Sequence, residues 1–237
     1  MKIYQITESS NGEESLMIAR ISVLDKGFVK LINFSSDLEK SVLHAAGVCI
    51  GRDEAPLSRL QYLLSMQPPH TTPWEHNILS FDVKAPIFVI RQWQRQRVGV
   101  SYNETSLRYT ESELEYYVPK EQNTRSYVAA MTVEIQRYKE LLHNGWPKER
   151  ARAVLGTGFY TFFTVSFNLL SLFHFIKLRA HPAAQWEIQQ YAHALFEMLL
   201  EISEPIWSAF IGGLKTSWSQ KAFETVIEER YSHMLGK

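Results

Sequence analysis

One stretch of the chain concentrates side chains that could bind a phosphorylated, hydrogen-bonding ligand. It runs from Arg91 to Tyr109 and reads RQWQRQRVGVSYNETSLRY. Guanidinium groups are planar and permanently charged, which suits phosphate, and a glutamine amide both donates and accepts hydrogen bonds, as the edge of a heterocycle requires. On a helix, Arg91 and Arg95 would share one face, whereas Arg97 would leave by another side. We therefore expect a binding site here.

A dense set of polar side chains follows Gly99, where we expect irregular backbone just past the helix. This composition is typical of binding loops held on a rigid scaffold. Two other interpretations stay open, a solvated basic helix end with a polar loop, and an RNA-binding patch of arginine and tryptophan. The balance of 25 Lys plus Arg against 25 Asp plus Glu, with no second basic stripe, counts against nucleic acid. The polar set consists of Ser101, Asn103, Glu104, Ser106 and Arg108.

Composition indicates a domain with a sizeable core, since 45% of the 237 residues are hydrophobic. One cysteine, Cys49, excludes an internal disulfide. The start MKIYQITESSNGEES has no long apolar run, so we expect no signal peptide. Polar residues interrupt the apolar stretch 159–176, which favours buried core over a membrane span. We expect a cytoplasmic protein without a membrane segment.

The pattern along the chain predicts a mixed α+β protein with more helix than strand. Residues 16–34 read as a hairpin around Asp25-Lys26-Gly27, and 77–84 alternate as a strand with two unlike faces. Asp37 is the expected cap of a short helix through Ala46. The segment 159–168 fits either a strand or a buried helix. Further helices are expected at 56–66, from Pro86, at 124–142, from Pro147, at 183–201 and near the C-terminus.

The order of residues resembles a known family, the flavin-dependent (ThyX-type) thymidylate synthases. Its signature is Arg-His-Arg within a pattern close to RHRxxSxNExSxRY, and this chain has Arg95-Gln96-Arg97 followed by SYNETSLRY. The segments LDKGFVKLINF (24–34), HTTPWEH (70–76), VKAPIFVIRQW (83–93) and LRAHPAAQWEIQQYA (178–192) also resemble the family. We expect an N-terminal extension at 1–22 and a single catalytic domain at 23–237.

The resemblance implies a central, mostly antiparallel sheet flanked by long helices. It also implies a homotetramer with FAD between subunits, methylenetetrahydrofolate as carbon donor and NADPH as reductant. The implied reaction is reductive methylation of dUMP at C5 to give dTMP. The reduced flavin takes part in that chemistry, so no enzyme cysteine has to attack the pyrimidine, and the presence of Cys49 alone fits this.

The resemblance also implies site residues. Ser106, at the signature serine, and Arg179 are the expected catalytic residues, with Arg179 polarising the uracil carbonyl side as C5 becomes nucleophilic. The expected nucleotide contacts are Gln92, Arg95, Glu104, Ser106, Leu107, Arg108, Arg152 and Arg179. The expected flavin contacts are Cys49, His70, Thr72, Glu75, Arg95, Gln96, Arg97, Asn168 and His174.

The chain departs from the family pattern mainly on the flavin side. Gln96 replaces the signature histidine, Leu170 stands where an arginine is usual, Cys49 replaces a serine, and Gly47 lies near a usual arginine. The three residues 98–100 separate Arg97 from Ser101 where the pattern has two. The hypothesis is a diverged member. Alternatives are a related enzyme acting on UMP or another pyrimidine nucleotide, or transferring another one-carbon group, and a non-catalytic nucleotide- or RNA-binding homologue that lost flavin.

His70, Glu75 and His76 are the residues that could suggest a metal site. Their spacing matches no established zinc motif, so we expect none.

Overall fold

The computed structural model describes residues 3–8, 14–66, 69–109, 113–120 and 123–213, with backbone only for 3–8 and 14–18. Any helix beyond 213, in the C-terminal region expected to be helical, lies outside the described residues. Within them, no helix combines the length and apolar character needed to cross a membrane.

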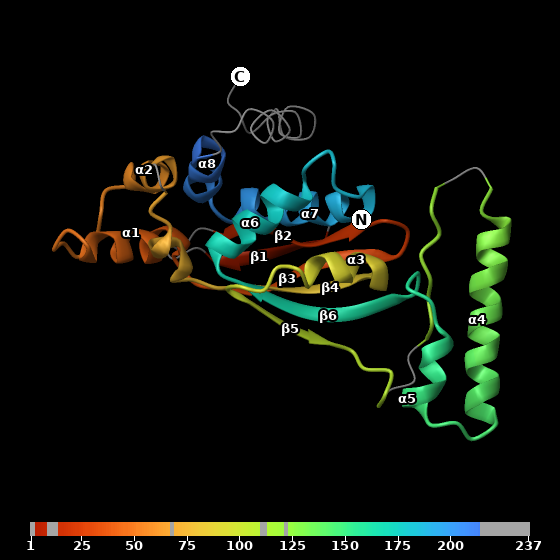
Figure 1. The fold of residues 1–237 in the computed structure, drawn as a ribbon. Coiled ribbons are helices and arrows are strands. Elements are labelled where there is room, and N and C mark those ends of the chain that lie inside the picture. The colour runs from red at the N-terminus through yellow and green to blue at the C-terminus, as the bar shows by residue number, and fades with distance from the viewer. Residues whose placement is uncertain (1–2, 9–13, 67–68, 110–112, 121–122, 214–237) are drawn as a thin grey trace.

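A six-stranded sheet forms the centre of the molecule, and every neighbouring pair of strands is antiparallel. The strand order is β1-β2-β3-β4-β6-β5, so β5 lies at an edge although it precedes β6 in the chain. The prediction of an α+β fold around a mostly antiparallel sheet is confirmed (Figure 1). The strands are β1 Ile3–Glu8, β2 Glu14–Val23, β3 Gly27–Phe34, β4 Leu79–Pro86, β5 Val100–Glu104 and β6 Tyr160–Phe167.

The hairpin expected around residues 25–27 is confirmed as β2 and β3, which meet in the pair Val23 and Gly27. A side chain at position 27 would bring its Cβ to 2.7 Å from the carbonyl of Lys84 and 2.8 Å from that of Val23, so the close approach requires glycine. Strands β1 and β2 continue the sheet beyond β3. The division into an extension at 1–22 and a domain at 23–237 stays a prediction.

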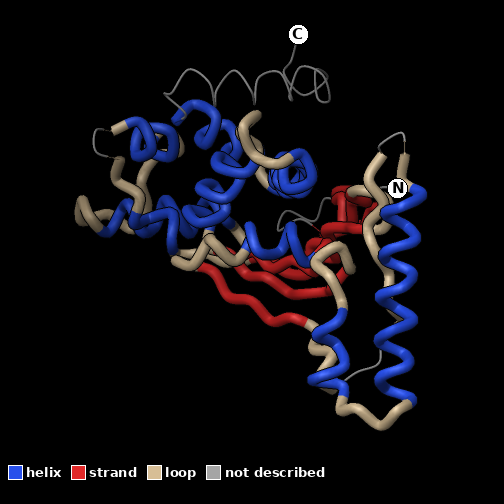
Figure 2. Tube along the Cα trace, turned by 45° about the vertical axis from the view of Figure 1, so that its right-hand side comes forward, coloured by secondary structure: helices blue, strands red, loops and turns tan. Residues whose placement is uncertain are grey.

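Helices α3, α6 and α7 lie over one face of the sheet, with α1, α2 and α8 beside them (Figure 1). Helices α4 and α5 stand apart, past the ends of the strands, in both views (Figures 1 and 2). The helices are α1 Leu38–Val48, α2 Arg59–Ser65, η1 Thr72–Glu75, α3 Ile87–Trp93, α4 Arg125–His143, α5 Lys148–Ala151, η2 Arg152–Val154, α6 Leu169–Arg179, α7 Trp186–Ile202 and α8 Glu204–Gly213.

Most expected helices are present within a few residues of their predicted bounds. Helix α3 begins directly after Pro86 and α5 directly after Pro147, because proline fits the first turn of a helix, where its missing N–H is not needed. The predicted cap by Asp37 is wrong in its detail. Asp37 has a left-handed backbone (φ 54°) and its side chain makes no capping hydrogen bond, although α1 does begin at Leu38.

The segment left open between strand and buried helix is the strand β6, which has two unlike faces. Phe163, Val165 and Phe167 point to the helix-covered face and are buried. Phe162, one position earlier than Phe163, points to the other face and is 38% exposed. The alternation follows from the two-residue period of a strand. The core therefore lies between the sheet and the helices on one of its faces.

The two faces of β6 lead to a matched prediction. Replacement Phe163→Ala should lower the free energy of unfolding by about 3–5 kcal/mol because it empties a buried site. Replacement Phe162→Ala should cost less than about 1.5 kcal/mol, since much of that ring is already in water. Urea unfolding of both variants measures the difference. Equal losses would contradict the prediction and would indicate that the open face is covered in solution.

Candidate active site

Helix α3 positions the first group of expected binding residues. Val89, Ile90 and Trp93 form its buried face, and Trp93 packs against Phe175 with ring centroids 4.4 Å apart. The helix ends at Trp93, so Arg95 lies beyond it. The expectation that Arg91 and Arg95 share a helix face is therefore wrong. The physical reason is that Trp93 is held in the core while a neighbouring strand contacts the backbone of the turn after it.

The last turn of α3 meets the end of α6. Arg179, the last residue of α6, donates from Nη2 to the carbonyl of Gln92 at 2.8 Å. The side-chain amide of Gln92 donates to Gln185 at 2.7 Å. Burial lowers the pKa of Arg179 from its usual value, and the nearby Arg95 lowers it further. A guanidinium stays protonated through such shifts, so the structure brings two cations close together at the end of α3.

The expectation of irregular backbone after Gly99 is wrong, because residues 100–104 form the edge strand β5. It pairs with β6 from Val100 opposite Phe167 to Glu104 opposite Phe163. Beyond the strand, Tyr109 N donates to the carbonyl of Ser106 at 3.1 Å and forms a turn. The polar residues thus lie on a strand and on the turn that follows it. The polar composition of residues 100–104 does not indicate a strand, because this strand depends on its pairing with β6.

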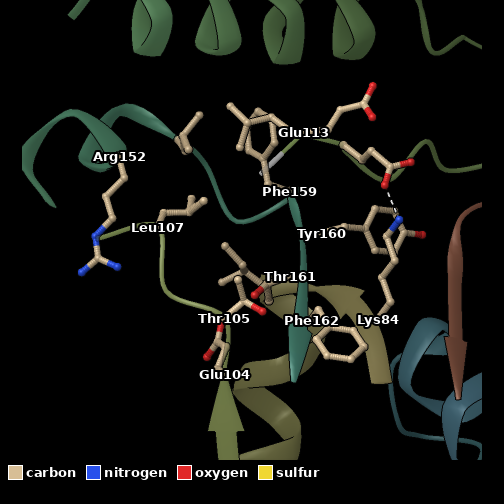
Figure 3. Close-up of a pocket in the computed structure, with 14 residues that line it drawn as sticks. Lys84, Glu104, Thr105, Leu107, Glu113, Arg152, Phe159, Tyr160, Thr161 and Phe162 are labelled. Carbon is tan, nitrogen blue, oxygen red and sulfur yellow. Dashed lines mark hydrogen bonds and ion pairs between the residues drawn. The ribbon is translucent and has the colours of Figure 1, made fainter. Parts of the chain in front are cut away.

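A cavity of about 430 Å³, which we name the β6 pocket, lies beside the end of β5. Three expected nucleotide contacts line it, Glu104, Leu107 and Arg152. Figure 3 shows Arg152 at one end and Lys84 at the other, where Lys84 pairs with the carboxylate of Glu115. Sequence reasoning missed Lys84 and Glu115. The alternation of 77–84 indicates which face Lys84 occupies, but nothing in the sequence indicates its partner.

Two other expected nucleotide contacts lie in the turn after β5. The side-chain oxygen of Ser106 accepts from the amide of Arg108 at 3.3 Å. The Nε of Arg108 lies 4.0 Å from the carboxylate of Glu149, and both side chains are about half exposed. These residues are near Leu107 in the chain, but they are not among the residues that line the β6 pocket.

A second cavity, the α6 pocket, gathers six of the nine expected flavin contacts. Its volume is about 390 Å³, and it is lined from η1, the turn after α3 and the start of α6. Within the described part of the chain, neither Arg95 nor Arg97 forms an ion pair, so both guanidinium groups are available to an anion. The six residues are Glu75, Arg95, Gln96, Arg97, Asn168 and His174, and Leu170 also lines the pocket.

His174 is the titratable imidazole of the α6 pocket. Partial removal from water lowers its pKa below 6.5, and the positive charge of Lys177 on the same helix lowers it further. Much of the residue nevertheless stays exposed. The side chain is therefore neutral at neutral pH and can both donate and accept a hydrogen bond.

The other three expected flavin contacts line a third cavity, the α1 pocket. Cys49, His70 and Thr72 lie there, in a volume of about 580 Å³. The short helix η1 contributes to both cavities, because Thr72 lines the α1 pocket and Glu75 lines the α6 pocket. All nine expected flavin contacts therefore lie around η1. In the described residues, no group of three His, Cys, Asp or Glu side chains could hold a metal ion.

The turn between Arg97 and Ser101 is hydrogen-bonded to the start of α6. Gly99 has φ 65°, a left-handed conformation that favours glycine. Asn168 N donates to the carbonyl of Gly99 at 3.1 Å, and Ser171 Oγ donates to that of Val98 at 2.5 Å. Asn168 also caps α6 by accepting from Ser171 N at 2.8 Å.

The expected nucleotide contacts fall into two groups in a single chain. Gln92, Arg95 and Arg179 surround the end of α3, whereas Glu104, Leu107 and Arg152 line the β6 pocket. No described cavity is lined by both groups. The residues that sequence analysis expected to meet around one ligand therefore share no described cavity, although Gln94, in the turn after α3, donates from Nε2 to the carboxylate of Glu104 at 3.5 Å.

The fold and the pockets define an α+β protein with an antiparallel sheet and with cavities lined by arginine and amide side chains. The sequence pattern of the family described as "Thymidylate synthase complementing protein" matches residues 30–203. The flavin-dependent thymidylate synthase of Thermotoga neapolitana is 42% identical over 207 residues, which cover 81% of this chain and 94% of that protein. An enzyme of the same name from Thermus thermophilus is 40% identical over 215 residues, which cover 80% of this chain and 77% of that protein. The chain belongs to the flavin-dependent thymidylate synthase family.

Solved structures give the same fold. The UMP/dUMP methylase PolB from Streptomyces cacaoi bound with 5-Br dUMP has a TM-score of 0.72 and 27% identity, covering 83% of this chain and 100% of that one. The same methylase bound with 5-Br UMP has a TM-score of 0.71 and 28% identity, with the same coverage.

The turn at Gly99 leads to a second matched prediction. A Cβ at Gly99 would clash with Ser171 and Asn168, whereas a Cβ at Gly145, which also has a positive φ of 78°, would meet nothing within 4 Å. We expect Gly99→Ala to destabilise the protein by about 3 kcal/mol, from backbone strain and overlap together. Gly145→Ala should lower the free energy of unfolding by about 1 kcal/mol, from backbone strain alone. Thermal and urea unfolding measure both. Equal effects would show that the turn is not packed against α6.

Proposed function

We propose that this protein is a flavin-dependent thymidylate synthase that methylates dUMP at C5 to give dTMP. Methylenetetrahydrofolate supplies the carbon and NADPH supplies the electrons. Family membership supports this proposal, and so does the similarity to a UMP/dUMP methylase. The structural observation that carries it is the placement of all nine expected flavin contacts around η1.

The residues of the α6 pocket fit a flavin. Its volume of about 390 Å³, with about 580 Å³ in the α1 pocket, lies in the range of cofactor sites. Arg95 and Arg97 suit the diphosphate of FAD, and the amides of Gln96 and Asn168 suit the polar edge of a heterocycle. A bound reduced flavin supplies the reducing equivalents of the reaction.

Arg179 is the residue best placed to act on the pyrimidine. Its hydrogen bond to the carbonyl of Gln92 fixes the guanidinium at the end of α3 and leaves other N–H groups to donate. Such donors would polarise a uracil carbonyl and stabilise the negative charge that develops as C5 becomes nucleophilic. The side-chain amide of Gln92, already ordered by Gln185, would orient the same base.

The residues around the β6 pocket would hold the sugar and phosphate. Arg152 provides a permanent charge for phosphate, and Glu104 can accept hydrogen bonds from a ribose hydroxyl. Ser106 and Arg108 lie in the turn that follows β5, on either side of Leu107, and they add further hydrogen-bond donors. No cysteine is needed as nucleophile, and Cys49 lines the α1 pocket.

The division of these residues supports a site completed by a second copy of the chain. The Arg179 group and the Arg152 group share no described cavity in one chain, although one nucleotide needs both. Symmetric oligomers build such sites by facing different surfaces of two identical chains. We therefore propose a homotetramer with its active sites at subunit interfaces.

Anaerobic turnover of the flavin-loaded protein with NADPH, methylenetetrahydrofolate and dUMP tests the proposal, with the product identified by mass. We expect a nucleotide heavier by one methyl group. UMP is a second candidate substrate, because the similar methylase binds brominated analogues of both nucleotides, and competition between dUMP and UMP would rank them. Absence of flavin absorbance, or of product from either nucleotide, would reject the enzyme in favour of a non-catalytic binding protein.

Mixing two inactive variants tests the shared site. Arg179→Ala and Arg152→Ala should each abolish product formation, since each removes a charge from one half of the site. When the two variants are unfolded and refolded together, about a quarter of wild-type activity should return, because one site in four then combines two intact halves. Activity is measured with dUMP, and each variant refolded alone serves as control. A mixture as inactive as its components would contradict a site shared between chains.

A further inference from the structure

Tyr102, on the edge strand β5, contacts the turn that carries the signature residues. Its hydroxyl donates to the carbonyl of Trp93 at 2.7 Å and lies 3.2 Å from the carbonyl of Gln96. One O–H can share its proton between two acceptors in this way. Burial raises the pKa of Tyr102 above its ordinary value, and Arg179 partly opposes the rise. The hydroxyl therefore stays protonated and acts as a donor.

The carbonyl groups at the end of α3 need donors from elsewhere, because the last turn of a helix leaves its carbonyls without helical partners. Arg179 supplies a donor for the carbonyl of Gln92, and the carbonyl of Trp93 accepts from both the amide of Gln96, at 2.9 Å, and the hydroxyl of Tyr102. The ring of Tyr102 is itself held by the sheet. It packs near Phe163, with centroids 6.2 Å apart, and its backbone pairs with Val165. The hydroxyl is thus a rigid point of attachment.

The far side of the same turn is attached to α6. Ser171 holds the carbonyl of Val98 and Asn168 holds that of Gly99. Arg95, Gln96 and Arg97 therefore lie between two attachments, with β5 on one side and α6 on the other. All three line the α6 pocket. Of the two attachments, the α6 side binds residues 98 and 99, and the Tyr102 hydroxyl reaches Gln96 itself.

We propose that Tyr102 is a positioning residue, whose hydroxyl sets the backbone of Arg95–Arg97 so that these side chains face the flavin. The proposal rests on the proposed function in so far as the α6 pocket binds flavin. Tyr102 has no direct contact with the cofactor in this role. It acts through the carbonyls of Trp93 and Gln96.

Tyr191 offers a matched control, because its hydroxyl also donates to a backbone carbonyl, that of Lys84, at 2.7 Å. It belongs to α7 and lines none of the three pockets described above. Replacement of either tyrosine by phenylalanine removes one hydroxyl and leaves the ring. A purely structural role would make the two variants alike in flavin binding.

Fluorescence titration of Tyr102→Phe, Tyr191→Phe and wild type with FAD tests the proposal. We expect the flavin Kd of Tyr102→Phe to rise about three- to tenfold, the effect of one lost hydrogen bond, and that of Tyr191→Phe to stay at the wild-type value. Hydrogen exchange of the flavin-free proteins should show faster exchange at residues 94–99 in Tyr102→Phe only. Equal flavin affinity in all three proteins, or unchanged exchange at 94–99, would overturn the proposal.

The two measurements separate this proposal from the proposed function. If wild-type protein binds no flavin, the proposed function fails and, with it, any role of Tyr102 toward a cofactor. In that case, faster hydrogen exchange at residues 94–99 in Tyr102→Phe alone would show only that the Tyr102 hydroxyl holds the turn after α3. If wild type binds flavin and turns over dUMP while Tyr102→Phe behaves like Tyr191→Phe, the function stands and the positioning role is rejected.

Discussion

The hydrogen bonds to the end of helix α3 are the interactions on which the site depends. Trp93 is fully buried and fixes the helix in the core, and the carbonyls of Gln92 and Trp93 lie beyond the last helical hydrogen bond, which Gln94 N donates to Ile90. Arg179 and Tyr102 supply donors to these carbonyls from α6 and β5. The amide of Gln96 also donates to the carbonyl of Trp93, and these hydrogen bonds together join α3, α6 and β5 at the end of α3. The binding residues project from that point.

The sequence alone predicted much of the fold because its signals were local. The hairpin at Asp25-Lys26-Gly27 follows from turn residues between two runs of β-branched and aromatic residues. The starts of α3 and α5 follow from Pro86 and Pro147, which fit the first turn of a helix. These signals need no knowledge of what lies beside each segment in the fold. The nine flavin contacts that the family resemblance implies stay a prediction, although they all line the two pockets that share η1.

Strand β5 could not be predicted because its stability is not local. Ser101, Asn103 and Glu104 have low strand preference, and the strand exists through its pairing with β6, about sixty residues later in the chain. The end of α3 escaped prediction for a related reason. Arg95 could continue a helix, but the carbonyl of Trp93 instead accepts from the amide of Gln96, in a tighter turn, and from the hydroxyl of Tyr102. Both errors come from contacts between elements distant in sequence.

The departures from the family pattern have a shared physical consequence in the α6 pocket. Gln96 and Leu170 both line it, and neither can carry a charge. The permanent cations that remain are Arg95 and Arg97, set against the carboxylate of Glu75. With glutamine in place of histidine, His174 is the imidazole that lines this pocket, and burial lowers its pKa below the ordinary value. Relative to the family pattern, the α6 pocket therefore lacks one imidazole and one guanidinium group, and Arg95 and Arg97 are the guanidinium groups that line it.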